Sequence, residues 1–280
     1  MKKLLLVISC VLATVQLHAQ ESVALVLNAK PNAVFEITTE DKNSMITNLN
    51  GNKELIALLK QEGSEFPKYE TQEFTAKYML NWKKADKNKA TFELDLVKQL
   101  IRNFKANALE STLNEGEEKG ITNGYLGKEG VKATKDIEAK YKNENSDILA
   151  LLDDLFNSQG YPSKPIKVND TFSVQNNKVM KLSEDNEVDV LTREDIKFSK
   201  IENKKAYLVI LSTITSESKS VKFAKVKGKG TKEVIYNIEK QYIESVSGST
   251  NVTMNIETEE SLTINVTNNT TQKVKVKLKE

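Results

Sequence analysis

Carboxylates and amines are the main reactive side chains of this chain, because histidine and cysteine each occur once. Cys10 and His18 both lie in residues 1–19, where Met-Lys-Lys, an apolar run and Ala19 predict a signal peptide cleaved after Ala19. The mature chain then lacks both residues. Without them it cannot form a Ser-His-Asp triad, a thiolate nucleophile, a disulfide or the usual zinc and haem sites.

One alternative concerns the start of the chain. The sequence Val7-Ile-Ser-Cys10 formally resembles a bacterial lipobox, so lipidation at Cys10 and cleavage after Ala19 both stay open. No later stretch has the roughly 20 apolar residues that a membrane-spanning helix needs. We therefore predict an exported protein without a transmembrane span, in the periplasm or at the outer-membrane periphery of a Gram-negative bacterium.

The charge balance argues against a nucleic-acid partner. Loss of Lys2 and Lys3 with the signal leaves 39 of the 41 basic residues, against 39 acidic residues. The mature chain is formally neutral and has no net field to attract nucleic acid.

Paired carboxylates are the remaining catalytic candidates. Asp153 and Asp154 are adjacent on an expected helix and so point about 100° apart, which favours a solvated face over acid–base work. A glycosidase needs only two carboxylates, so it stays a third alternative. The acidic loop Asp185–Asp189 lacks the glycine and final glutamate of an EF-hand. We predict no metal and no cofactor.

A central helix and the connector after it carry Asp153 and Asp154 and link the two parts of the chain. From Ser146 to Ser158 the apolar residues recur at helical spacing, with Ser146 as N-cap and Gly160 as the terminating residue. Pro162 and Pro165 then favour an extended connector, followed by an Asn169-Asp170 turn and a strand. The apolar helix residues are Ile148, Leu149, Leu151, Leu152, Leu155 and Phe156.

The first part of the chain predicts strands and one short helix. Strands are expected at residues 23–27, 33–39, 71–81 and 91–96, a helix at 53–60 and a charged hairpin turn at 83–89. Residues 97–113 fit a helix or a strand. Residues 114–130 contain several glycines that match no phosphate-binding pattern, which predicts a flexible loop.

Alternating strands dominate after the central connector, at residues 195–199, 206–214, 220–226, 233–238, 251–256, 260–266 and 273–278. We interpret the lysines between them as the solvated face of an antiparallel sheet. These lysines are Lys219, Lys222, Lys225, Lys227, Lys229, Lys232, Lys273, Lys275, Lys277 and Lys279.

An internal repeat predicts that the chain consists of two similar halves. Residues 80–94 align without gaps on 196–210, and residues 30–37 on 167–174, placing Trp82 on Phe198 and Phe35 on Phe172. The expected fold class is α+β, mainly antiparallel β, with two similar β-rich halves in curved sheets packed on an amphipathic helix. The halves are residues 20–145 and 166–280, joined by 146–165.

The segment Pro162-Ser-Lys-Pro-Ile-Lys-Val-Asn-Asp-Thr-Phe172, with a leucine-rich helix before it and threonine-rich strands after it, resembles a family of uncharacterised secreted or lipid-anchored proteins of Bacteroidota-type bacteria. That family carries a domain of unknown function and usually has glycine and tryptophan where this chain has Asn169 and Phe172. The resemblance implies a cell-envelope location and transfers no catalytic residue.

The leading functional hypothesis is a non-catalytic envelope protein that binds an apolar or lipid-like ligand. One-sided strands around an apolar helix resemble, at the level of fold, the half-barrels of periplasmic lipoprotein carriers. The alternative is a structural or protein-interaction module of the envelope. The expected apolar pocket is lined by Phe35, Trp82, Phe92, Leu152, Phe156 and Phe172.

Overall fold

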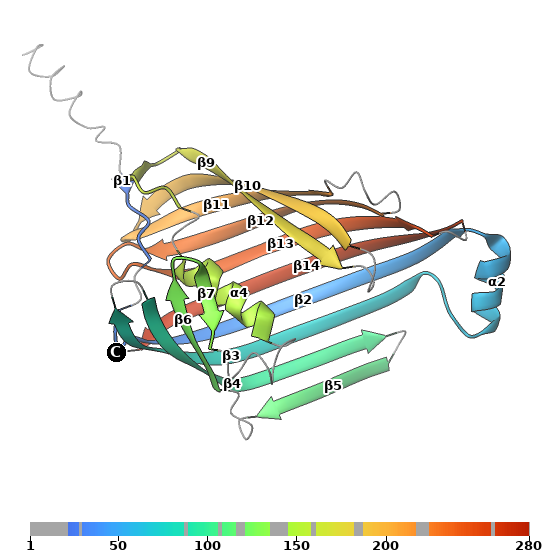
Figure 1. Cartoon of the computed structure of the whole chain (residues 1–280), viewed down its shortest axis with the longest axis horizontal. Helices are drawn as coiled ribbons and strands as arrows, with labels where there is room; N and C mark the ends of the chain where they lie inside the picture. The colour runs from blue at the N-terminus through green and yellow to red at the C-terminus, as the bar shows by residue number, and fades with distance from the viewer. Residues whose placement is uncertain are drawn as a thin grey trace, which may run out of the picture.

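A single large antiparallel sheet dominates the computed structural model (Figure 1). Its twelve strands follow the order β7-β6-β4-β3-β2-β14-β13-β12-β11-β10-β9, with β5 paired to β4. This confirms the mainly antiparallel β class. The structure describes residues 22–27, 30–86, 89–105, 108–115, 121–134, 145–157, 161–181, 187–216, 224–258 and 261–279.

Long strands build this sheet. Their bounds are β2 (Val34–Gly51), β3 (Lys68–Asp86), β4 (Lys89–Lys105), β5 (Ala108–Glu115), β6 (Ile121–Gly127), β7 (Gly130–Ala133), β9 (Thr171–Lys181), β10 (Glu187–Glu202), β11 (Lys205–Ser216), β12 (Ala224–Asn237), β13 (Tyr242–Glu257) and β14 (Leu262–Lys279). The short strands β1 (Ser22–Val23) and β8 (Ile166–Lys167) pair separately. Because β2 pairs with β14 from Val34↔Lys279 to Gly51↔Leu262, the first and last parts of the chain share one sheet.

Two helices accompany the sheet, both near their predicted positions. Helix α2 (Lys53–Gln61) begins where the Asn52 side chain accepts a hydrogen bond from the Leu55 N–H at 3.1 Å, a typical N-cap contact. Helix α4 (Asn145–Phe156) begins one residue before Ser146, so Ser146 lies inside the helix and the N-cap prediction is wrong. The predicted terminator Gly160 lies outside the described residues, as do Cys10, His18 and the whole predicted signal peptide.

Several sequence predictions are corrected by the strand bounds. For residues 97–113 the sequence leaves helix and strand open; residues 97–105 and 108–113 form strands. The predicted loop 114–130 contains β6, and most of the predicted turn 83–89 belongs to β3 and β4. Strand β1 stops at Val23, well short of the predicted residue 27. Residues 262–266 and 273–278 belong to one strand, because the asparagine and threonine residues between them continue the backbone pairing with β13 and β2 instead of making a turn.

Two aligned hairpins have the same local geometry. Strands β3 and β4 shift register between Trp82 and Lys84, and β10 and β11 shift between Phe198 and Lys200. The N–H of Asn32 donates to the Trp82 carbonyl at 2.8 Å, and that of Asn169 to the Phe198 carbonyl at 2.7 Å. Both asparagines have positive φ, 62° and 75°, a conformation that asparagine tolerates well. The Asn169 turn is therefore confirmed, while a shared architecture of the complete halves stays a prediction.

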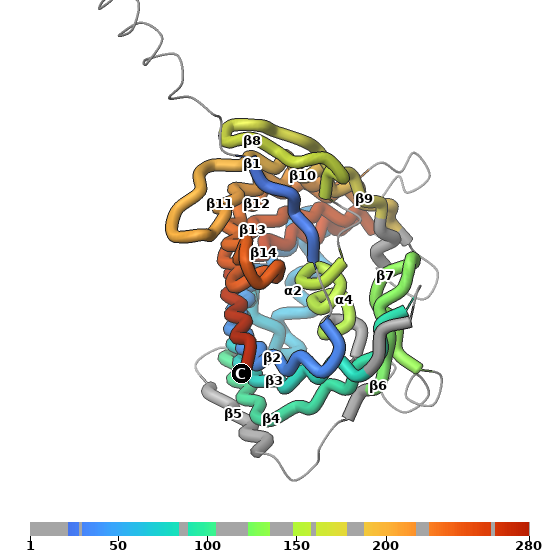
Figure 2. Tube along the Cα trace, turned by 90° about the vertical axis from the view of Figure 1, so that its left-hand side faces the viewer, coloured from blue at the N-terminus to red at the C-terminus, as the bar shows by residue number. Residues whose placement is uncertain are grey.

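The sheet curls, and α4 lies on its concave side (Figure 2). Near α4, strand alternation puts apolar side chains on this concave face and mostly charged or hydroxylated ones on the convex face. On β14, for example, Val274 and Val276 are at most 5% exposed, whereas the predicted solvated lysines Lys273, Lys275 and Lys277 are exposed. Helix α4 buries Ile148, Leu152, Leu155 and Phe156 against this face, in the main core cluster. None of the helices in the described ranges is long and apolar enough to cross a membrane.

Candidate functional site

The predicted pocket residues come together as a packed aromatic cluster. The Phe156 ring of α4 lies edge-on to Phe35 at 5.3 Å and to Trp82 at 5.5 Å, and Trp82 lies edge-on to Phe92 at 5.4 Å. These four side chains and Leu152 are at most 3% exposed. Side chains therefore fill the space between the five, and their role in holding a ligand stays a prediction.

The sixth residue, Phe172, lies at the margin of this cluster. It is half-buried on β9, and its ring is 6.4 Å from that of Tyr161, in an edge-on arrangement. Tyr161 in turn lines a separate cleft between α4 and the concave face. The six residues of the predicted apolar pocket thus lie close to this cleft, but none of them lines it.

This cleft has an apolar floor and a polar rim. Its volume is about 480 Å³. Ile196, Ile210, Val234 and Ile243 are buried to 6% exposure or less and form the centre of the floor. The other lining residues are Asp153, Asp154, Asn157, Tyr161, Val174, Asn176, Thr192, Glu194, Lys232 and Val246. We refer to it as the α4 cleft.

Charged residues from the sheet meet on one side of the α4 cleft. The Lys232 ammonium on β12 is 3.2 Å from Glu194 Oε1 on β10, and the buried Ser212 hydroxyl on β11 donates to the same oxygen at 3.2 Å. The Lys232 and Glu194 side chains are 30% and 27% exposed, so solvent screens this ion pair only in part. The described lining residues supply three carboxylates and one ammonium, which favours cationic or hydroxylated groups over anions.

On the helix side, Asp153 is a structural residue. Its Oδ1 accepts hydrogen bonds from the Val131 N–H at 2.8 Å and from the Asn157 amide at 3.0 Å, which fixes β7 to α4. Gly130 makes this approach feasible, because its φ is +88° and a Cβ there would lie 2.6 Å from Asp153 Oδ1. The prediction of a solvated face is thus confirmed for Asp154, which is exposed, and is wrong for Asp153, which is half-buried and bonds to the backbone of β7.

Tyr161 contributes a phenol to the rim. Burial raises its pKa well above the usual range, and the negative charges of Asp154 and Glu194 raise it further. The phenol is thus neutral at physiological pH and can donate a hydrogen bond to a bound polar group.

The α4 cleft has the properties of a binding site. Its size falls within the roughly 300–1,000 Å³ of small-molecule pockets, and a few polar groups surround an apolar floor, as is common in such pockets. Among the described residues, no group of three or more histidine, cysteine, aspartate and glutamate side chains could hold a metal ion.

Sequence reasoning missed the charged residues of this cleft, although a signal was present. Lys225, Lys227 and Lys229 are exposed as predicted, but Lys232 is half-buried and faces the concave side, so its assignment to the solvated face is wrong. The physical reason is parity: Lys232 shares its face with Val234 and not with the odd-numbered lysines. Lys219 and Lys222 lie outside the described residues.

No family model matches the chain, and no curated protein matches it either. Among solved structures, an outer membrane channel from Pseudomonas putida F1 is 10% identical, over 90% of this chain and 97% of the channel chain, with a TM-score of 0.26. The translocator domain of the autotransporter NalP from Neisseria meningitidis is 6% identical, over 88% of this chain and 90% of that domain, with a TM-score of 0.22. Scores this low carry no argument about this chain, and the Bacteroidota resemblance stays a prediction.

Proposed function

We propose that this chain is a non-catalytic, exported protein of the cell envelope that binds a small amphipathic, lipid-like molecule in the α4 cleft. The observation that carries the proposal is the combination of a buried apolar floor with a polar rim in one cleft of about 480 Å³. The predicted signal peptide and the resemblance to secreted Bacteroidota proteins support the envelope location.

The direction of the sheet's curvature supports an apolar ligand. Its apolar face is concave and holds α4, while its convex face is charged, so apolar surface lies inside the curve. An acyl chain or ring on Ile196, Ile210 and Val234 would extend this core, with a free energy gain of roughly 0.8 kcal/mol per buried CH₂ group. Its polar end would lie near Tyr161, Glu194 and Lys232.

The binding test uses the mature chain, residues 20–280, and the neutral fluorescent probe N-phenyl-1-naphthylamine. We expect saturable binding, which Val246→Trp reduces by about tenfold or more because the larger side chain fills part of the cleft. Leu211→Trp is the matched control, since Leu211 is 53% exposed and lies on the opposite face of β11 from Ile210. Absence of saturable binding, or equal binding by both variants, would contradict the proposal.

A second candidate function, a protein-interaction module, is favoured by exposed aromatic side chains. Tyr69 on β3 is 58% exposed and Phe104 on β4 is 37% exposed, both on the convex face. Exposed aromatic residues are common in interfaces. Tyr69→Ser with Phe104→Ser should then abolish crosslinking to an envelope partner while leaving probe binding in the α4 cleft unchanged.

A further inference from the structure

A second cleft lies away from α4, on strands β2, β3 and β4. Its volume is about 400 Å³. Three amide side chains in register cross it, because Asn43 on β2 is opposite Gln72 on β3, and Gln72 is opposite Asn103 on β4. The described residues that line it are Asn43, Met45, Glu70, Thr71, Gln72, Asn103 and Phe104, of which Thr71 and Phe104 alternate out of phase with the amides and belong to the opposite face of the sheet. We call Asn43, Gln72 and Asn103 the amide row.

Hydrogen bonds orient the amide row without using up its capacity. Gln72 Nε2 donates to Asn103 Oδ1 at 3.0 Å, and the Thr270 hydroxyl of β14 donates to Asn43 Oδ1 at 3.4 Å. Each primary amide has two N–H donors and a carbonyl oxygen with two lone pairs, so donors and acceptors remain for a ligand. Gln72 is exposed and the other two amides are half-buried, which leaves the row accessible from the cleft.

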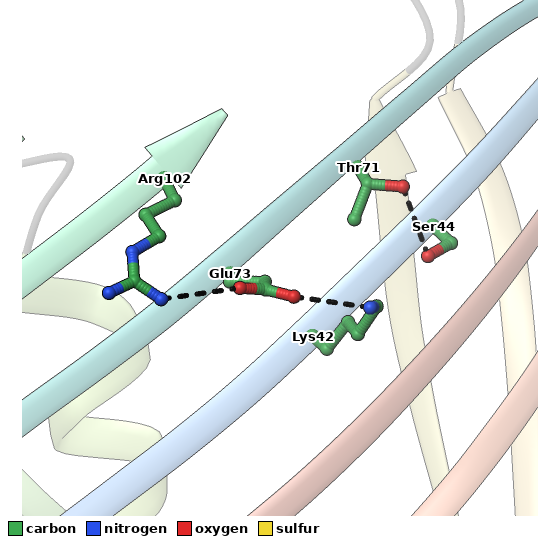
Figure 3. Close-up of polar contacts among 5 residues, drawn as sticks. All are labelled: Lys42, Ser44, Thr71, Glu73 and Arg102. Carbon is green, nitrogen blue, oxygen red and sulfur yellow. Dashed lines mark hydrogen bonds and ion pairs between the residues drawn. The ribbon is translucent and has the colours of Figure 1, made fainter. Parts of the chain in front are cut away.

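The opposite face of the same strands holds the row in position. There Glu73 on β3 is 3.1 Å from Lys42 on β2 and 3.8 Å from Arg102 on β4, and Thr71 donates to Ser44 at 3.3 Å (Figure 3). These contacts cross all three strands behind the amide row. A site held in this way loses little conformational freedom on binding.

The charge of the second cleft is nearly balanced. Among the side chains that the structure describes, Glu70 is the only charged one in the lining, and its Oε1 is 2.9 Å from the Lys68 ammonium. An anionic or cationic ligand thus gains little here. Met45 adds an apolar contact surface next to the amides.

We propose that the amide row binds an uncharged saccharide chain. Neighbouring sugar hydroxyls offer a donor and an acceptor side by side, which matches the paired donor and acceptor of a primary amide. The row repeats at the strand separation of about 4.8 Å, close to the length of one sugar unit in an extended chain. Met45 can contact the C–H face of a ring. This site is separate from the α4 cleft and does not depend on the function proposed for it.

Isothermal titration calorimetry of the mature chain tests this. The probes are six-unit oligomers of β1,4-glucose, α1,4-glucose, N-acetylglucosamine, mannose and xylose. We expect at least one saturable isotherm, and a loss of affinity of about tenfold in both Asn43→Ala and Gln72→Ala from the removed hydrogen bonds. Gln72→Glu retains the side-chain size and should also weaken binding, because it replaces two donors by a charge.

Asn251→Ala is the matched control. Its amide donates to Asn269 on the convex face, so its loss should leave saccharide affinity unchanged. Circular dichroism and thermal unfolding check that each variant is folded. The proposal is overturned if no oligomer binds, if the amide-row variants bind as tightly as the parent chain, or if only an extended glycine-serine decapeptide binds with this dependence on Gln72.

Discussion

The two ends of β2 and β14 bury their inward side chains to very different degrees. At the covered end, near α4, Phe35 and Ile37 of β2 and Val276 of β14 are at most 5% exposed. At the distal end, Met45 of β2 and Val266 of β14 lie on the same face of the sheet but are only half-buried. On these two strands, alternation decides which face a side chain joins, and burial is deepest near α4. On the neighbouring strands of the distal end, Val188, Val190, Ala224 and Val226 form a second, smaller buried cluster that does not include α4.

Polar residues separate the apolar surfaces of the two ends. The amide row and the Glu194–Lys232 pair cross the concave face there, so the apolar surface of the two ends is interrupted. Both clefts lie along this band of polar residues. We therefore expect stability to depend mainly on the covered end, and binding on the clefts beside the polar band.

The largest expected effect is at the covered end. Trp82→Ala removes a 1% exposed ring that packs on Phe92 and Phe156, so it should lower the free energy of unfolding by about 3–5 kcal/mol. Urea unfolding of the mature chain measures this.

Trp82→Phe is the control for this experiment. Within the described residues, the buried indole Nε1 of Trp82 has no hydrogen-bond partner, so removing that donor offsets part of the lost burial. We expect a much smaller loss than for alanine. Equal losses for the two variants would show that ring packing is not what stabilises this end.

The contact between α4 and β7 should have the next largest effect. Asp153→Ala leaves the Val131 N–H without its acceptor, which should cost about 1–3 kcal/mol in the free energy of unfolding. Asp154→Ala, at the exposed neighbour, should stay within about 0.5 kcal/mol of the parent chain. If both variants unfold at the same urea concentration, Asp153 does not hold the helix at the covered end.

The contrast between the ends explains what the sequence could predict. Alternation identified the antiparallel class and the lysine face of β14, because a period of two residues is a local property. It predicted α4 from the spacing of Leu152, Leu155 and Phe156. Strand length was missed, since asparagine and threonine signal turns locally yet pair across long strands here. The α4 cleft was missed because Glu194 and Lys232 are 38 residues apart, and only tertiary packing brings them together.

An acid-sensitive ion pair on the convex face should have a smaller effect. Lys279 of β14 and Lys77 of β3 contact Glu36 of β2, and their hydrogen bonds lower the pKa of this carboxyl from 4.5 to about 2. The stabilisation is present above pH 4.5 and is lost as the pH falls toward 2. Because the group is near the surface, we expect about 1 kcal/mol or less.

Urea unfolding of Glu36→Gln and the parent chain between pH 7 and pH 2 measures this effect. The parent chain should be more stable at pH 7, and the difference should disappear near pH 2. A difference that is constant with pH would mean that the charge of Glu36 is not the cause.

A similarly small effect is expected at the distal end. Met254 on β13 faces Val226 and Val266 on the neighbouring strands and is only half-buried, so Met254→Ala removes a side chain that has kept part of its contact with water. We expect a loss of about 1 kcal/mol in the free energy of unfolding, well below the 2–5 kcal/mol typical of a fully buried methionine. Urea unfolding beside Trp82→Ala gives a direct comparison of the two ends. If Met254→Ala were as destabilising as Trp82→Ala, the distal end would be as tightly packed as the covered one, and α4 would not be the cause of their difference.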